Sequence, residues 1–82
     1  MAYRRRTLEM QADTIEAVMA RHKVAGRVKG GVVTPRFVQF QITTDVGAKV
    51  KQVTNLADEF AMALGKREAR VYRKNGAINV EI

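Results

Sequence analysis

The chain has 82 residues, 46% of them hydrophobic, with a net charge of +7 and no cysteine. These values exclude two separate cores, a disordered chain, disulfides and thiolate metal sites. No apolar run approaches the roughly 20 residues of a membrane span, and the N-terminus lacks the apolar segment of a signal peptide, so we expect no membrane contact by this segment. The absence of cysteine fits a reducing compartment, and we expect a cytoplasmic domain.

The positive charge favours a polyanionic partner, most often nucleic acid, although basic residues can also serve only to solvate a surface. Residues 1–6 are predicted to form a basic, flexible arm, and residues 7–82 a single folded domain. This domain begins with a helix over residues 7–22, with Thr7 as its N-cap. One stripe of the helix is apolar, as helical periodicity requires: Leu8, Ala12, Ile15, Val18 and Met19.

Residues 24–43 are expected to form two strands. The first, VAGRVK, is short, and the glycine pair at 30–31 permits a turn after it. In the second, PRFVQFQIT, alternate residues Val38, Phe40 and Ile42 point to one face. Phe37 lies on the other face, where it is either a single exposed apolar residue or, as we favour, the anchor of a subunit contact.

The segment VGAKVKQVTNLADEFAMALGK, residues 46–66, indicates a short strand that leads directly into a helix. In AKVKQV, Lys49 and Lys51 share the outward face of the predicted strand. Thr54 or Asn55 is expected to cap the helix, and Gly65 to follow its last turn. The buried stripe of the helix recurs every four residues: Leu56, Phe60 and Leu64.

The C-terminal segment EARVYRKNGAINVEI is predicted to be a hairpin, because Asn75-Gly76 is a strong signal for a two-residue turn. This turn sets the cross-strand pairs: Lys74 with Ala77, Tyr72 with Asn79, Arg70 with Glu81, Val71 with Val80, and Ala69 with Ile82. The predicted fold class is therefore α+β. Two helices pack on one face of a small, mainly antiparallel sheet, in the order α-β-β-(β)α-β-β.

Enzyme signatures are missing from the sequence. His22 is the only histidine, and it has no cysteine to share a metal and no nearby serine to activate. Asp58 and Glu59 are neighbours on a helix and diverge by about 100°. ALGKRE fails as a phosphate loop, because Phe60 and Arg67 stand where glycine and Ser or Thr are required. We expect no catalytic residue, no metal site and no cofactor in this chain.

Basic residues gather between residues 21 and 36, a segment that contains no acid. If the neighbouring strands pair, two lysines of the next segment join them. The candidates for contacts with the DNA backbone are Arg27, Lys29, Arg36, Lys49 and Lys51. The alternative is a solvated turn region. A second cluster alternates basic and aromatic residues at Arg70, Tyr72 and Lys74, and the expected pairing of Arg70 with Glu81 favours a structural role for it.

The segment GAKVKQVTNLADEFAMAL resembles a segment of the FtsK/SpoIIIE family of bacterial DNA translocases, with the pattern G-V-K-V-x-x-I-x-N-L-A-x-D-x-A-x-A-L. Matching positions are Gly47, Lys49, Val50, Asn55, Leu56, Ala57, Ala61, Ala63 and Leu64. TPRFVQFQI and GAINVEI are similar to the flanking family motifs at Pro35, Phe40, Ile42, Gly76, Val80 and Glu81. The resemblance covers residues 7–82 and corresponds to the alpha domain of the family.

The resemblance implies a non-catalytic alpha domain of a hexameric, ATP-driven translocase of double-stranded DNA. In this family the alpha domains and the downstream RecA-like ATPase domains form stacked hexameric rings around the duplex, and ATP and Mg belong to the ATPase ring. The implied role is a ring collar and subunit contact, in chromosome segregation, sporulation or conjugative transfer. The alternative is a free-standing, small, basic nucleic-acid-binding protein.

Overall fold

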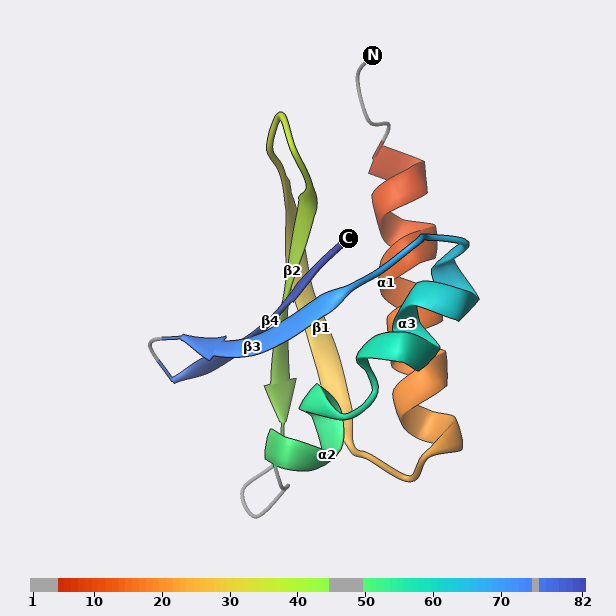
Figure 1. Ribbon diagram of the computed structural model, residues 1–82, viewed down its shortest axis with the longest axis vertical. Coiled ribbons are helices and arrows are strands. Elements are labelled where there is room, and N and C mark those ends of the chain that lie inside the picture. The colour runs from red at the N-terminus through yellow and green to blue at the C-terminus, as the bar shows by residue number, and fades with distance from the viewer. Residues whose placement is uncertain (1–4, 45–49, 75) are drawn as a thin grey trace.

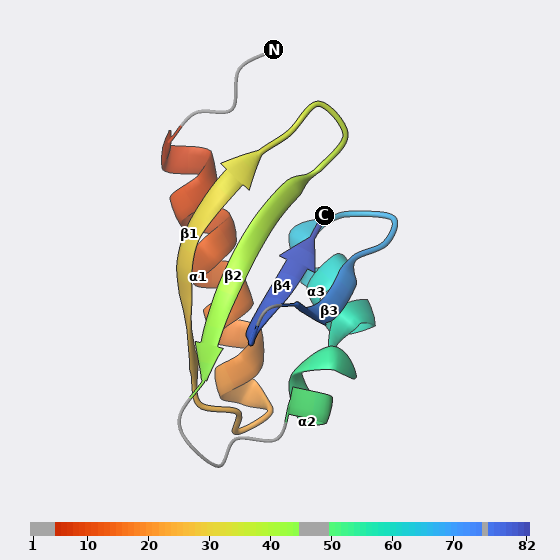
Figure 2. The same cartoon turned by 90° about the vertical axis from the view of Figure 1, so that its left-hand side faces the viewer.

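The computed structural model describes residues 5–44, 50–74 and 76–82. In chain order the elements are α1 (Arg5–Arg21), β1 (Gly26–Val33), β2 (Val38–Thr44), α2 (Val50–Thr54), α3 (Ala57–Leu64), β3 (Arg70–Lys74) and β4 (Ala77–Glu81). The strands form one sheet in the order β1-β2-β4-β3, and all neighbouring pairs are antiparallel. In Figure 2, α1 and α3 lie behind the sheet, and Figure 1 shows α2 near the end of β2. The predicted α+β class is confirmed.

The core lies between the sheet and the two longer helices. Alternate residues of β2 point into it, as predicted, and Phe40 is 1% exposed. From α3 comes Phe60, which is 0% exposed. The predicted stripe of α1 also faces the core, because its C-terminal half is fully buried and its N-terminal half packs against the core. Those stripe residues are Leu8, Ala12, Ile15, Val18 and Met19.

The helix α1 begins earlier than predicted, at Arg5. Thr7 is therefore an internal helical residue and not an N-cap. Arg5 and Arg6, which were assigned to the basic arm, belong to the first turn, where Arg5 forms an ion pair with Glu9 at 3.4 Å. Residues 1–4 of the predicted arm lie outside the described residues.

Residues 50–54 form α2, so the strand predicted in AKVKQV is wrong. The segment is too short for alternation to be told from a helical period, and the burial follows the helical one. Val53 is buried and Val50 is half-buried, a spacing of three that places both on one side of a helical turn. The predicted cap of α3 is also wrong, because Leu56 occupies the N-cap position without a side-chain hydrogen bond. Gly65 follows α3 with a φ of 67°, as predicted.

The glycine pair at 30–31 does not form the turn that the sequence predicts. β1 continues through it to Val33, and its register with β2 shifts between Val28 and Gly31, which marks a β-bulge. Gly30 supplies the positive φ of 77°. A Cβ atom at Gly31 would lie 2.9 Å from Cε1 of Phe40, so glycine here permits a close approach of the strand to that ring.

The predicted β3–β4 hairpin is confirmed in its register. Arg70 pairs with Glu81, Tyr72 with Asn79, and Lys74 with Ala77, with Val71 opposite Val80 on the other face. Asn75 itself lies outside the described residues. The other neighbour of β4 is β2, so the hairpin joins the sheet through its second strand and leaves β3 at one edge, opposite β1.

Candidate nucleic-acid interface

The face of the sheet opposite α1 and α3 is polar, and we call it the open face (Figure 2). Side chains alternate along a strand, so the residues between the core positions belong to this face. Cross-strand partners agree with this assignment, since Arg27 lies opposite Thr43 and Gln41 opposite Asn79. Two apolar residues belong to the open face, Val32 opposite Gln39 and Ala77 opposite Lys74. Its polar residues are Arg27, Lys29, Gln39, Gln41, Thr43, Arg70, Tyr72, Lys74, Asn79 and Glu81.

Cations occupy both edge strands of the open face. Arg27 and Lys29 lie on β1, and Arg70 and Lys74 lie on β3; all four are exposed. On the inner strands β2 and β4, the open face carries neutral amides and one hydroxyl, together with a single carboxylate. Exposed guanidinium and ammonium groups on either side of neutral hydrogen-bonding groups suit a polyanion that lies across the sheet, through contacts with phosphates and not with bases.

The single carboxylate of the open face, Glu81, is already occupied. Its side chain is 12% exposed; Arg70 Nη1 lies 3.6 Å from Glu81 Oε1, and the Tyr72 hydroxyl donates a hydrogen bond to Glu81 Oε2. The predicted pairing of Arg70 with Glu81 is confirmed. The Arg70 guanidinium also lies 5.5 Å from the centroid of the Tyr72 ring. Because the Arg70 side chain is 73% exposed, it remains accessible to an anion while it offsets the charge of Glu81.

Two amides complete this polar network. Asn79 is 3% exposed, and its Oδ1 accepts a hydrogen bond of 2.9 Å from Nε2 of Gln39. The same Gln39 nitrogen lies 3.4 Å from the Tyr72 hydroxyl. Buried amides are stable when their hydrogen bonds are satisfied, so these contacts connect β2, β4 and β3. The other cationic edge, β1, is held to β2 by their antiparallel ladder.

We expect Tyr72 to ionise at a higher pH than a free tyrosine. The hydrogen bond to Glu81, burial and the charge of Glu81 raise its pKa above the ordinary value of about 10, and Arg70 opposes the rise. Since the folded-state pKa exceeds the unfolded one, the resulting stabilisation is present below about pH 10 and is lost as the pH rises through the folded-state pKa. The measurement is an absorbance titration of Tyr3→Phe, in which Tyr72 is the only tyrosine.

The matched variant for this titration is Tyr3→Phe with Glu81→Gln, which removes the carboxylate and keeps the side-chain shape. Its Tyr72 midpoint should fall toward about 10. Equal midpoints in the two proteins would show that Glu81 does not control the ionisation of Tyr72.

The structure brings together only part of the predicted set of DNA-backbone residues. Arg27 and Lys29 lie side by side on β1 and belong to the open face. Arg36 lies in the β1–β2 turn at one end of the molecule, whereas Lys51 lies on α2 at the other end (Figures 1 and 2). Lys49 lies outside the described residues.

The candidate for a subunit contact, Phe37, is half-buried and belongs to the same β1–β2 turn as Arg36. Conversely, Arg70 and Lys74, for which a structural role is predicted from the sequence, share the open face with Arg27 and Lys29. Their spacing of two predicts that these side chains lie on one face of a strand. It does not predict the strand order, which places β3 next to β4 and β2 next to β1.

Among the residues that the structure describes, no helix has the length and apolar character needed to cross a membrane. Within the same residues, no group of three or more His, Asp or Glu side chains is placed to hold a metal ion.

Comparison with known proteins shows which family this chain is similar to. A family model described as the FtsK alpha domain matches residues 1–82. The chain is 31% identical over 65 residues to a DNA translocase FtsK of Lactiplantibacillus plantarum, which covers 79% of this chain and 8% of that protein. It is 26% identical over 81 residues to a DNA translocase FtsK of Halalkalibacterium halodurans, which covers 95% of this chain and 10% of that protein. The chain thus spans a tenth or less of the length of these relatives.

Proposed function

The chain belongs to the FtsK alpha domain family, and from this premise we propose that it is the non-catalytic, DNA-contacting collar of a DNA translocase. In this proposal the open face contacts the phosphate backbone of duplex DNA, and copies of the domain form a hexameric ring around it. ATP hydrolysis, with its Mg, takes place in a downstream RecA-like ATPase domain of the longer protein. The relatives named as DNA translocases, which are about ten times longer than the matched region, support this division.

The observation that carries the proposal is the arrangement of charge on the open face. Cations lie at both edges, neutral donors lie between them, and the only carboxylate is paired. Contacts with phosphates carry no sequence information, so such a face holds any stretch of duplex equally well. Non-specific binding of this kind is weak, with dissociation constants of about 10⁻⁴–10⁻⁶ M at physiological salt. A collar on a moving duplex needs binding that is weak and independent of sequence, because every contact must be released as the DNA advances.

Fluorescence anisotropy with a labelled duplex tests the proposal. We expect weak binding that is the same for two unrelated sequences. The double variant Arg27→Gln/Lys29→Gln should bind more weakly. If both side chains contact phosphates, the slope of log K against log salt should also become shallower by about 1.8, at about 0.9 per phosphate.

The matched control for this test is Arg21→Gln/Arg67→Gln, which removes the same charge from the end of α1 and from the segment between α3 and β3. It should change the salt slope much less. An equal loss in the two double variants would mean that only net charge matters, and nanomolar, sequence-selective binding by the wild-type chain would reject the collar role.

A further inference from the structure

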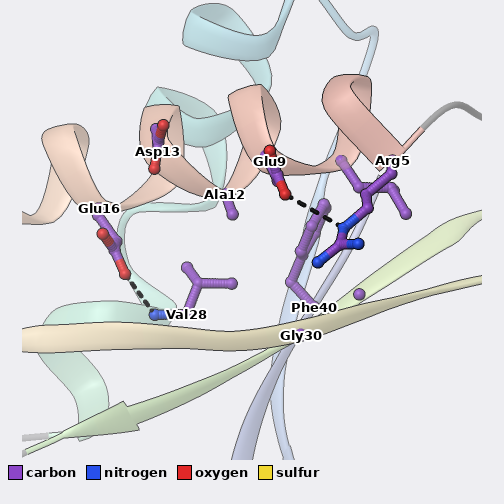
Figure 3. A pocket seen from close by; sticks show the side chains of 10 residues that line it. Arg5, Glu9, Ala12, Asp13, Glu16, Val28, Gly30 and Phe40 are labelled. Atoms are coloured by element: carbon purple, nitrogen blue, oxygen red, sulfur yellow. Dashed lines mark hydrogen bonds and ion pairs between the residues drawn. The ribbon is translucent and has the colours of Figure 1, made fainter.

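A groove of about 360 Å³ lies between α1 and β1, on the helix side of the sheet (Figure 3). Its floor is apolar and is formed by Leu8, Ala12, Val28 and Phe40. Its rim on α1 is acidic. The three rim residues follow one another at spacings of four and three, which places them on one side of the helix: Glu9, Asp13 and Glu16.

The acidic rim is a local exception on a chain with a net charge of +7, since it holds three of the eight acidic residues. Glu9 is paired with Arg5, and Oε2 of Glu16 accepts the N–H of Val28 at 2.8 Å. Val28 belongs to the edge strand β1. Because its N–H is bonded to Glu16, that group is not available to pair with a further strand at this edge. Asp13 is exposed and forms no ion pair with any residue that the structure describes. The groove therefore presents a free carboxylate beside an apolar floor.

A second surface has the opposite charge and is also apolar. We call residues 32–37, the end of the β1–β2 hairpin, the hairpin tip. Val32 and Val33 are 59% and 46% exposed, which is high for large apolar residues in a strand. Arg36 is exposed and Phe37 is half-buried beside them. The hairpin tip thus combines exposed apolar side chains with a cation, and it contains no acidic residue.

Hydrogen bonds hold the hairpin tip in one conformation. Oγ1 of Thr34 accepts the N–H of Phe37 at 3.0 Å and donates to the Phe37 carbonyl at 2.8 Å. The backbone N–H of Thr34 donates to the same carbonyl at 2.8 Å, and the β1–β2 ladder extends to Val33 opposite Val38. A surface element that is already ordered loses little conformational entropy when it binds a partner.

We propose that the hairpin tip of one copy of this chain docks in the acidic groove of a second copy. Val33, which lies on the core side of β1 opposite Val38, covers the apolar floor, and Arg36 pairs with Asp13 of the partner copy. The tip cannot enter its own groove, because β1 leads from the groove at Gly31 directly into the tip as part of a hydrogen-bonded ladder. The partner of each groove is therefore a different molecule.

The two surfaces share no residue, so each copy offers one tip and one groove. A contact between two different patches repeats from copy to copy, and it closes into a ring when the rotation allows it. This inference rests on the ring in the proposed function and names the surfaces that build it. Apart from Val32, which lies opposite Gln39, the open face takes no part in the contact and stays available to DNA.

Charge reversal tests the contact by sedimentation equilibrium at low salt. We expect the wild-type chain to self-associate, and Arg36→Glu or Asp13→Lys to weaken self-association about tenfold, because each places like charges together. The double variant Arg36→Glu/Asp13→Lys restores the opposite pair and should associate within about threefold of wild type. Both positions are exposed, so these variants keep the fold. Arg67→Glu is the control, with the same charge change outside both surfaces.

Three results would overturn the contact: no self-association of the wild-type chain, a double variant weaker than either single variant, or an equal effect of Arg67→Glu. DNA anisotropy with the same variants separates the two proposals. If Arg36→Glu weakens DNA binding and leaves self-association unchanged, the tip contacts DNA and the docking proposal fails. If charge reversal behaves as expected but Arg27→Gln/Lys29→Gln binds DNA normally, the contact stands and the DNA role of the open face fails.

Discussion

Replacement of Phe60 by alanine is expected to lower the free energy of unfolding by about 3–5 kcal/mol. Phe60 is 0% exposed and is the largest side chain that α3 contributes to the core. Its loss removes apolar burial and leaves a cavity that the surroundings can fill only in part. The helix has only eight residues and ends at Leu64, so it has little else to hold it on the sheet. A domain of this length has a total stability of about 4–12 kcal/mol, so the expected loss amounts to between about a quarter and all of it.

Urea denaturation followed by circular dichroism measures this effect. Met62→Ala is the matched control, because Met62 lies on the same helix and is 82% exposed. Its stability should change by less than about 0.5 kcal/mol. Alanine is the best helix former, so helix propensity cannot cause a loss in either variant. Similar losses in the two variants would therefore show that burial of the ring does not determine how α3 contributes to stability.

Replacement of Gly31 by alanine is expected to cost about 1–3 kcal/mol of unfolding free energy. The new Cβ would lie 2.9 Å from Cε1 and 3.2 Å from Cδ1 of the Phe40 ring. This ring is 1% exposed and cannot swing into solvent, so either β1 or the ring must shift. Thermal or urea denaturation measures the loss, and Val32→Ala, at the next position and 59% exposed, should have a much smaller effect.

A double variant identifies the cause of that loss. Phe40→Leu removes the ring atoms that Gly31→Ala would meet, although it has a cost of its own. If the close approach is the reason for glycine, the double variant Gly31→Ala/Phe40→Leu should be more stable than the sum of the single changes predicts. Strict additivity would show that the destabilisation arises elsewhere, for example in the β-bulge.

The core and the open face are two sides of the same strands, so the packing of one sets the geometry of the other. Phe40 and Val80 face each other toward the helices, while their neighbours Gln39 and Glu81 face each other on the open side. Any change that shifts β2 against β4 therefore moves the amide network and the two cationic edges together. For this reason, a measured loss of DNA affinity in a core variant would say nothing about direct contacts, and exposed positions such as Arg27 are the proper test.

Features that depend on neighbours along the chain can be predicted from the sequence. The apolar period of α1, the alternation in β2, the left-handed Gly65 after α3 and the β3–β4 register around residues 75–76 all come from local spacing or turn chemistry. Where the local signal was too short, it failed. Residues 50–54 contain too few positions to separate a strand from a helical turn, and the glycines at 30–31 suit a bulge as well as a turn.

The surfaces that these elements form depend on contacts between segments that are far apart in the chain. The order β1-β2-β4-β3 places Arg27 and Arg70 at opposite edges of one face, although they lie far apart in the sequence and share no local pattern. The helix α2, which carries Lys51, and the β1–β2 turn, which carries Arg36, lie at opposite ends of the molecule (Figure 1), so that the predicted basic set is divided. Periodicity predicts on which side of its own strand a residue lies. Which strands become neighbours depends on long-range pairing and on burial of a shared core. The open face and the acidic groove are products of that pairing.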